Sequence, residues 1–387
     1  MKPIKINLIL GSFIFISNSA LSANFGEFSS DLQNNSEAFV RSTCVGFVTA
    51  KENGELPQGT LQENLFTLCG SMVQSSNELE SEGTISPDGS RHLSEEALAS
   101  AYQNITPEET FTPLSLSADA ALTNMVGLNA HIGKIRKAGQ VLVYNDYNHL
   151  NSSGGSAGDS NSLLNDKLGF FLNFRGGFGD SQQTGSENSS NFNSQGFITG
   201  LDYRVLDNFI VGGSFGYSNL NLDFSKNINV SGGSADANQY DLSIFSTFYK
   251  KDFYIDGLFS YGWSDYALSR NIKIDSSNDN ITAVSTKAIA NPNGNQLAVS
   301  LSAGYDFHFK GLNYGPHIQL SYFNSVINQY DESGAAELNL HIGEQEVDSL
   351  ESVIGFHIEY ALSHSIAVFM PHFRLDWHHE YFQGSRS

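Results

Sequence analysis

The chain is poor in several residue types, and each shortage removes a class of protein from consideration. Its 387 residues include 20 Lys and Arg against 41 Asp and Glu, a formal net charge of -21. A nucleic-acid-binding function is therefore disfavoured, because phosphate backbones are bound by cations. Beyond residue 16 no stretch approaches the roughly 18 continuous apolar residues that a spanning helix needs. Cysteine occurs only at Cys44 and Cys69, and the region around them offers too few ligands for a metal site.

Glycine and aromatic residues, by contrast, are plentiful. The chain has 36 Gly, 28 Phe and 16 Tyr, and only 16% of its residues are charged. This composition is typical of a β-barrel with aromatic faces, small interior residues and polar loops. At the start, Lys2 and Lys5 precede an apolar run from Ile6 to Ile16, and small residues follow. We expect residues 1–23 to be a secretory signal peptide, since the run is too short for the alternative, a membrane anchor.

Alternating apolar and polar residues recur through the second half of the chain. In the run from Phe253 to Trp263 the apolar side chains share one face and the polar ones the other. The same alternation occurs at Tyr240, Leu242, Ile244 and Phe248, at Leu297, Val299, Leu301, Ala303, Tyr305, Phe307 and Phe309, and at Ile354, Phe356, Ile358 and Tyr360. A soluble sandwich would also alternate. Runs of about 9–11 residues or longer that end in Tyr or Trp instead favour a mainly β fold, an antiparallel transmembrane β-barrel.

Residues 24–139 indicate a helical segment ahead of the strands. One helix buries Phe39, Val40, Cys44, Phe47 and Val48, and a second begins at Thr60, with a capping box to Glu63. Cys44 and Cys69 lie on the apolar stripes of these two helices, which predicts a disulfide that joins an αα-hairpin and contributes roughly 3 kcal/mol. Two free buried thiols are the alternative. Ser94 and Thr106 are further predicted helix starts.

A longer helix is predicted from about Ser117 to Gly139. It carries Lys134, Arg136 and Lys137 near its end, where the helix dipole favours cations, and Gly139 is the expected cap. We expect this basic helix to enter the barrel lumen, with an ordinary helix of a periplasmic or exported domain as the equal alternative.

Residues 140–166 are predicted to form a polar flexible linker, and about nine strands are predicted from Leu168 onward. Tight turns alternate with long polar loops at Ser181–Asn193, Ser225–Asn238 and Asn271–Asn295, the asymmetry of an outer-membrane barrel with its short side in the periplasm. Either solvated ion pairs or contacts to a transiting helix would explain the residues that face the lumen, and cations at 134, 136 and 137 would suit their carboxylates. These predicted lumen-facing residues are Asp202, Arg204, Asp241, Asp256, Asp306, His308, His317, Glu359, His372 and Arg374.

The order of short motifs in this half resembles the translocator domain of bacterial autotransporters, the type V secretion family. The matching pieces are Leu168–Phe171, Thr199–Arg204, Gly212–Ser218, Phe253–Asp265, Gly304–Phe307, Tyr314–Pro316, Asp348–Leu350 and Pro371–Glu380. The segment Ile132–Gly139 also resembles the piece that precedes the barrel in a gammaproteobacterial subgroup whose exported part carries paired cysteines. The resemblance implies insertion in outer-membrane lipid, export by the Sec machinery and assembly by the barrel-assembly machinery.

Two features depart from that family. Its barrels have twelve strands and end in an aromatic residue, so we expect residues 167–387 to be a barrel domain that lacks its last strands. An odd strand count supports this expectation, because bacterial single-chain barrels are even-numbered and open edges are unsatisfied in lipid. The exported segment is also short and lacks a long β-helical repeat, so the resemblance identifies neither a surface ligand nor an effector activity.

No enzymatic activity, catalytic residue, metal or cofactor is predicted. A GDSL-type esterase is weakly suggested by Gly158-Asp159-Ser160, Gly179-Asp180-Ser181 and the stretch from Asp376 to His379. The sequence predicts no α/β scaffold that would hold a serine next to a histidine, so no catalytic triad is expected. The sequence therefore predicts an outer-membrane protein whose barrel anchors the helical segment and translocates it to the surface. A porin-like channel with a periplasmic helical segment is the main alternative, and a soluble β-sandwich adhesin is a third possibility.

Overall fold

The computed structural model describes most of the chain. The described residues are Val40 and Cys44 together with 61–80, 89–105, 112–144, 167–181, 189–224, 232–309, 312–360, 362–363, 368–369 and 371–382. The predicted signal peptide, most of the first predicted helix, the predicted helix start at Thr106 and the Gly158-Asp159-Ser160 motif lie outside these residues. Among the described helices, none combines the length and apolar character required to cross a bilayer.

Three α-helices with described bounds precede the strands. They are α2 (Leu61–Glu80), α3 (Glu95–Ile105) and α4 (Thr112–Tyr144). The start of α3 is set by its sequence, because the Ser94 hydroxyl accepts the Ala97 N–H at 3.2 Å, and Glu95 and Glu96 follow in the first turn. This confirms the helix start predicted at Ser94.

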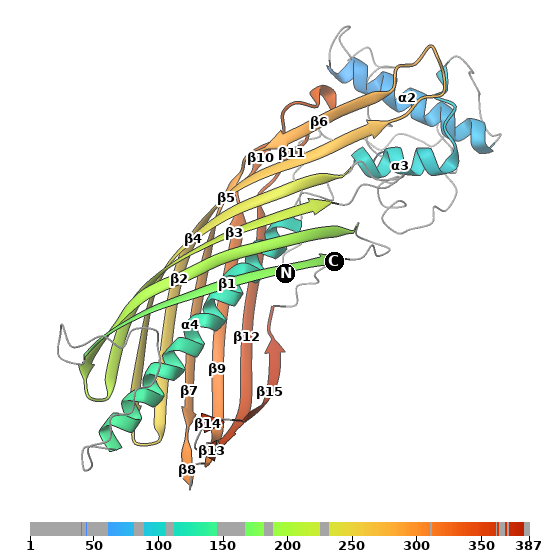
Figure 1. Ribbon diagram of the computed structural model, residues 1–387. Coiled ribbons are helices and arrows are strands. Elements are labelled where there is room, and N and C mark those ends of the chain that lie inside the picture. The colour runs from blue at the N-terminus through green and yellow to red at the C-terminus, as the bar shows by residue number, and fades with distance from the viewer. Residues whose placement is uncertain are drawn as a thin grey trace.

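An antiparallel sheet makes up the rest of the described structure (Figure 1). Its strands are β1 (Leu168–Ser181), β2 (Ser190–Leu206), β3 (Phe209–Phe224), β4 (Gly233–Lys250), β5 (Phe253–Ile274), β6 (Val284–Ala290), β7 (Asn293–Tyr305), β8 (Phe307–Phe309), β9 (Leu312–Ile327), β12 (Gln345–Tyr360) and β15 (His372–Glu380). Nine of them lie on the path β1-β2-β3-β4-β5-β7-β9-β12-β15, while β6 pairs with β5 and β8 with β9. The mainly β fold and the expected count of about nine are confirmed, and the described sheet is open between β1 and β15.

Smaller elements connect the later strands. The segment between β9 and β12 contains the short pair β10 (Tyr330–Asp331) and β11 (His341–Ile342) and the 3-10 helix η3 (Ala336–Leu338). A second short pair, β13 (Leu362–Ser363) and β14 (Val368–Phe369), lies between β12 and β15.

The two faces of the sheet differ as the alternation predicts. Along β5, exposed and buried residues alternate, with Phe253, Ile255, Phe259, Tyr261 and Trp263 exposed on the outer face. On the inner, concave face of the same strand, Tyr254, Asp256, Leu258 and Ser260 are buried. A large apolar outer face with a polar and buried inner face is the arrangement of a membrane barrel and is inverted relative to a soluble sandwich.

Two aromatic bands cross the outer face. The upper band runs through register-paired residues of five neighbouring strands, Phe174, Phe197, Tyr217, Tyr240 and Trp263. The lower band includes Phe253, Tyr305, Phe307 and Tyr314, with the Phe307 and Tyr314 rings stacked at 5.3 Å. Between Phe253 and Trp263, steps of about 3.3 Å span roughly 33 Å, which a barrel tilt of about 40° reduces to about 25 Å. This is the height of the apolar band of an outer-membrane barrel.

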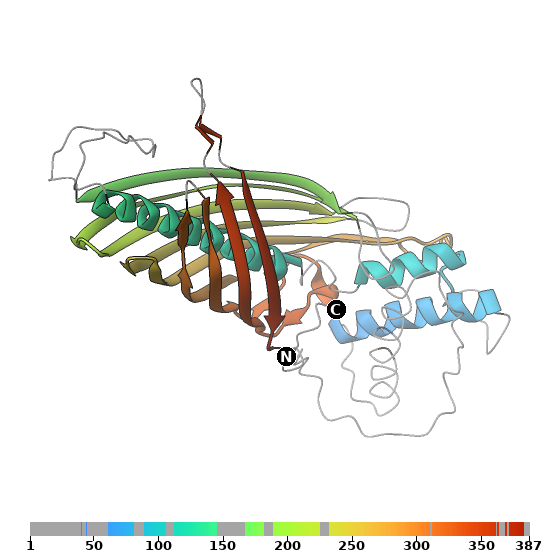
Figure 2. The same ribbon diagram turned by 90° about the horizontal axis from the view of Figure 1, so that it is seen from below.

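Several strands continue well beyond the upper band. On β5 the residues from Ser264 to Ile274 extend past Trp263, and β6 pairs with the last seven of them. The inner face there is apolar and is covered by the β10–β11 segment, in a cluster of Leu220, Leu222, Phe224, Ala235, Ala237, Tyr266, Leu268, Ala290, Ile327, Tyr330 and Ile342. Helices α2 and α3 pack at the far end of β5 and β6 (Figures 1 and 2).

The structure corrects several predicted boundaries. Helix α4 continues through Gly139 to Tyr144, so residues 140–144 are helix rather than linker. The predicted loop at 271–295 is largely strand, because β5 runs to Ile274 and β6 and β7 follow. Strands β2 and β4 likewise begin inside the predicted loops, at Ser190 and Gly233. In the three loop predictions, polar residues were assigned to loops although the chain keeps its strand pairing above the apolar band.

Candidate functional site

Helix α4 lies along the concave face of the sheet, where Figure 2 shows it inside the trough that the strands form. It packs against β3, β4, β5, β7, β9 and β12. One side of the helix carries small and apolar residues, Ala118, Ala121, Met125, Leu128 and Ile132, which pack on Phe171, Ile198, Phe245, Leu258, Ala298 and Phe323 of the sheet. The lumen region is therefore filled by a helix of the same chain.

Polar contacts accompany this apolar stripe in the middle of the helix. The Asn124 side-chain amide donates to Asp241 Oδ2 at 2.7 Å, and the Gln296 amide donates to Asp241 Oδ1 at 3.1 Å. About two helical turns further on, His131 Nε2 lies 3.2 Å from Asp202 Oδ2, and the His131 ring stacks on Phe171 with centroids 3.8 Å apart. Both carboxylates are predicted lumen residues, and both receive a partner from α4.

The buried centre of the contact is Arg136. Its guanidinium forms an ion pair with Asp256, and its Cζ lies 3.3 Å from the centre of the Tyr254 ring. Both charged side chains are more than 90% buried, and the Thr247 hydroxyl donates to the other oxygen of Asp256 at 2.6 Å. A buried charge is tolerated when it is paired and hydrogen-bonded, and an arginine over an aromatic face gains a further cation–π attraction. Arg136 therefore fixes both the position of α4 along the sheet and its rotation.

The other two basic residues of α4 are placed differently. Lys137 forms an ion pair with Glu359 of β12 and is partly exposed, while Lys134 is exposed. Because Arg136 meets Asp256 near the start of β5 and Asn124 meets Asp241 nearer the upper band, the C-terminal half of α4 lies at the end of the tight turns. Strand β1 begins at that same end, since Leu168 pairs with Tyr203 next to the turn between β2 and β3.

A second polar cluster lies on the concave face between β7, β9, β12 and β15. Asp306 is fully buried, with His357 Nε2 at 3.1 Å from its Oδ1. His317 Nε2 lies 2.9 Å from Asp376, whose other carboxylate oxygen accepts from Arg374 Nε at 2.6 Å. The two histidine rings are 5.9 Å apart. Within the part of the chain that the structure describes, these residues form separate acid–base pairs and no group of three ligands suits a metal.

The remaining predicted lumen residues are spread along the face. Arg204 shares the inward side of β2 with Asp202. His372 and Arg374 pair in register with Glu359 and His357, so they lie on the concave side of the β15 edge, where they are exposed. His308 is exposed at the tight-turn end, 3.3 Å from Asp252, and away from the contacts that hold α4.

Sequence reasoning missed the residues of α4 that make the mid-helix contacts. Asn124 and His131 are seven residues apart and flank the apolar positions 125, 128 and 132. Polar residues at helical spacing beside an apolar stripe are a detectable signal for a face that packs against a polar wall. His357 and Asp376, the partners of Asp306 and His317, were also missed.

The helical unit at the other end is held by the predicted disulfide, which is confirmed. Cys44 and Cys69 are bonded, with their Cα atoms 5.4 Å apart. Nearby, the Ser90 hydroxyl and the His92 ring contact the Glu78 carboxylate, and these hydrogen bonds lower the pKa of Glu78. Burial lowers the pKa of Arg91, whose Nε donates to Ser71 of α2 at 2.7 Å.

The residues considered for esterase chemistry have other roles. Ser181 ends β1, Asp376 contacts His317 and Arg374, and His378 lies 2.8 Å from Glu351. Strand β1, which ends at Ser181, and strand β15, which holds Asp376 and His378, are the two opposite edges of the described sheet.

Comparison with known proteins gives one family. The model of the autotransporter beta-domain matches residues 170–387, more than half of the chain. The solved translocator domain of the autotransporter NalP from Neisseria meningitidis is 15% identical with a TM-score of 0.44, over 67% of this chain and 77% of that one. The beta domain of the Bordetella autotransporter BrkA is 17% identical with a TM-score of 0.39, over 56% and 81%. No curated protein matches the chain. The chain therefore belongs to the autotransporter beta-domain family, and it is a protein of the bacterial outer membrane.

Proposed function

We propose that this protein translocates its own helical segment to the cell surface and keeps it anchored there, with α4 held across the barrel interior. One observation above all supports the proposal: the concave face presents a carboxylate partner to the helix at three successive levels. Asp241 meets Asn124, Asp202 meets His131, and Asp256 meets Arg136. If the lumen carboxylates were merely solvated, they would not need partners at matching positions of the helix.

The direction of the chain supports a surface position for the helical unit. Short turns of outer-membrane barrels face the periplasm and long connections face the outside. Helix α4 has its C-terminal half at the tight turns, so its N-terminal end points toward the long-loop end, where α2 and α3 lie (Figure 1). On this orientation α2 and α3 are outside the cell.

The test labels single cysteines in intact cells with a membrane-impermeant maleimide. The Glu96→Cys variant carries its thiol on the exposed first turn of α3, and the Asp207→Cys variant carries it in the turn between β2 and β3. We expect Cys at 96 to react in intact cells and Cys at 207 to react only after the outer membrane is permeabilised. Equal protection of both positions, or the reverse pattern, would refute the surface orientation. The unsubstituted chain, whose two cysteines are bonded to each other, is the background control.

The porin-like alternative places the helical segment in the periplasm and predicts the reverse labelling pattern. It also requires an open lumen, whereas α4 packs against six strands of the concave face. The packing of α4 thus favours anchoring over steady solute passage.

A further inference from the structure

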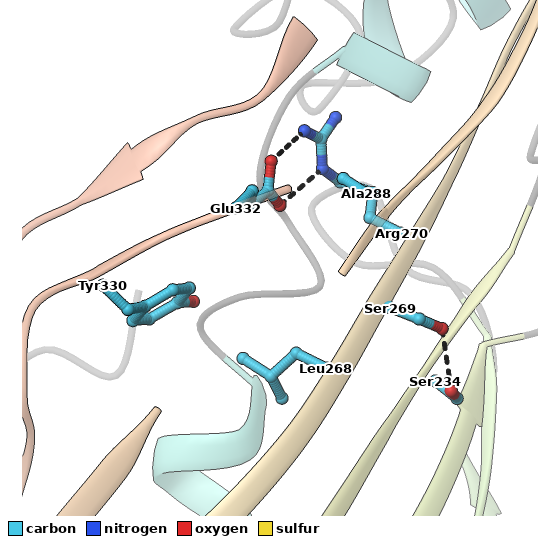
Figure 3. Close-up of a pocket in the computed structure, with 7 residues that line it drawn as sticks. All are labelled: Ser234, Leu268, Ser269, Arg270, Ala288, Tyr330 and Glu332. Atoms are coloured by element: carbon cyan, nitrogen blue, oxygen red, sulfur yellow. Dashed lines mark hydrogen bonds and ion pairs between the residues drawn. The ribbon is translucent and has the colours of Figure 1, made fainter. Parts of the chain in front are cut away.

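The strand ends above the upper aromatic band carry a buried arginine that belongs to neither the apolar outer face nor the α4 contact. Arg270 lies near the end of β5 and is 2% exposed. Figure 3 shows its guanidinium directed at the Glu332 carboxylate, beside Tyr330 and Leu268. Nε and Nη2 donate to the two oxygens of Glu332 at 3.2 and 2.6 Å. This two-point pairing is the geometry that arginine and carboxylate prefer.

The same guanidinium also holds the helical unit. Nη1 donates to the carbonyls of Asn104 and Ile105, both at 3.2 Å, and these are the last residues of α3. Nη2 donates in addition to the Leu338 carbonyl of η3 at 3.0 Å. Helix C-terminal carbonyls lack partners inside the helix, and a cation there also suits the helix dipole. Every N–H donor of Arg270 therefore has an acceptor, and the acceptors come from two parts of the chain, α3 and the segment between β9 and β12.

Apolar packing covers the same junction. Met72, Leu98, Ala101 and Tyr102 of α2 and α3 are buried with Ile272 and Ile274 of β5, Ala288 of β6, and Ala335 and Leu338 beside η3. The Asn104 side chain donates to the Lys273 carbonyl at 3.1 Å, and the Arg91 guanidinium donates to the Thr282 carbonyl at 3.3 Å. A buried apolar centre surrounded by hydrogen bonds is typical of a specific interface.

We infer that the end of β5 and β6, together with η3, is a docking site for the α2–α3 unit, so that the unit stays bound without its covalent connection to α4. The Cys44–Cys69 disulfide lies within the docked part and adds no covalent link to the sheet. The protein would accordingly retain its surface unit after proteolytic nicking between α3 and α4. This inference concerns retention, and it stands or falls separately from the membrane orientation proposed above.

The test inserts a recognition sequence for a site-specific protease between Ile105 and Thr112 of the full chain, purified in detergent micelles. After cutting, a non-reducing denaturing gel gives the cut fraction, and size-exclusion chromatography under native conditions gives the fraction of the N-terminal fragment that still travels with the sheet. We expect the fragment to co-elute. Prompt and complete separation of the fragment from the unsubstituted sheet would overturn the inference.

Two variants locate the interaction. Removing Arg270 leaves the buried Glu332 unpaired and strips the α3 carbonyls of their donor, so Arg270→Gln should shorten the lifetime of the cut complex at least about tenfold. Tyr102→Ala leaves every strand unaltered and should also shorten it. Lys250→Gln is the matched control, because this exposed cation lies at the end of β4 beside the tight turn, away from the docking site. An Arg270→Gln complex as long-lived as that of the Lys250→Gln control would rule out a role for Arg270 in retention.

Discussion

At the residue scale, the contact between Arg136 and Asp256 decides how α4 is held. Both side chains are taken out of water, which is expensive for each charge alone. The cost is offset only while the pair is intact, with Thr247 completing the carboxylate and Tyr254 covering the guanidinium. Loss of one partner is therefore worse than loss of an exposed ion pair such as Lys273 with Asp275.

Neutralising Asp256 should reveal this asymmetry. In Asp256→Asn the buried Arg136 charge loses its counter-ion, so we expect a loss of about 3–5 kcal/mol in the stability of the α4–sheet assembly. The midpoint temperature of the heat-induced shift in gel mobility measures it. Asp180→Asn, at an exposed position of β1, is the control and should leave the midpoint within the experimental scatter. Equal midpoints for the two variants would contradict the role given to the buried pair.

Buried polar contacts of this kind could be predicted only in part. The lumen side of Asp241 and Asp256 followed from strand alternation, because a period of two assigns every side chain to a face. Their partners on α4 could not be predicted. Pairing Asn124 with Asp241 requires the position of the helix along the sheet, and neither the helical nor the strand periodicity of the sequence gives that position. His308 illustrates the same limit: its face was predictable, but its position at the tight-turn end depended on where β7 gives way to β8.

At the scale of elements, helices α2 and α3 depend on a short polar joint. The last turn of α2 carries Glu78, and Ser90 and His92 lie just before α3 begins. The Glu78 carboxylate accepts a hydrogen bond from the Ser90 hydroxyl and lies 2.8 Å from His92 Nδ1. These hydrogen bonds lower the pKa of Glu78 in the folded chain below its ordinary value. The ionised carboxylate is thus the form that holds the joint.

The sign of the resulting pH dependence is fixed. A depressed folded-state pKa contributes stability at pH values above the unfolded pKa and loses it as the pH falls through the folded pKa. We expect limited proteolysis of the α2–α3 unit to accelerate as the pH is lowered from neutral toward about 3. Glu78→Gln should flatten this dependence, whereas Glu96→Gln, on the exposed first turn of α3, should leave it intact. An identical pH profile for all three chains would contradict the assignment.

The elements themselves were largely predictable, and their ends were not. The alternation of Phe253 to Trp263 predicted the membrane part of β5, but nothing in the polar stretch after Asn271 distinguishes a loop from a strand that is paired above the membrane. The burial of Ile272, Ile274 and Ala288 could not be predicted from the sequence, because it depends on the packing of α2 and α3 over them. The helix end predicted at Gly139 failed because a glycine ends a helix only when tertiary contacts allow it, and α4 continues for another turn.

At the scale of the whole molecule, the two aromatic bands define which part of the sheet meets lipid. Leu301 pairs with Gly257, midway between Phe253 and Trp263, and its side chain is 56% exposed on the outer face. Ile289 of β6 is 44% exposed but pairs with Ser269, above the upper band. Leu301 is therefore expected to face lipid, and Ile289 to face water.

An arginine at each position should separate them. A charge at the midplane of the lipid-facing wall costs about 2–4 kcal/mol and close to nothing beyond the interface. Leu301→Arg should therefore lower the stability of the protein in lipid vesicles, measured by denaturant unfolding, while Ile289→Arg should leave it near that of the unsubstituted chain. A larger loss for Ile289→Arg would place the membrane elsewhere on the sheet.

The length of β5 also has a mechanical consequence. A single strand runs from the tight turn beside Lys250, past the residues that hold Arg136, to the residues that hold α3. Tension applied to the α2–α3 unit at its docking site would be directed along this strand, and the hydrogen bonds to β4 and β7 cross that direction at right angles. Such bonds are loaded together in shear instead of opening one after another like a zip. The strand that crosses the membrane therefore also resists force that would pull the α2–α3 unit away from the sheet.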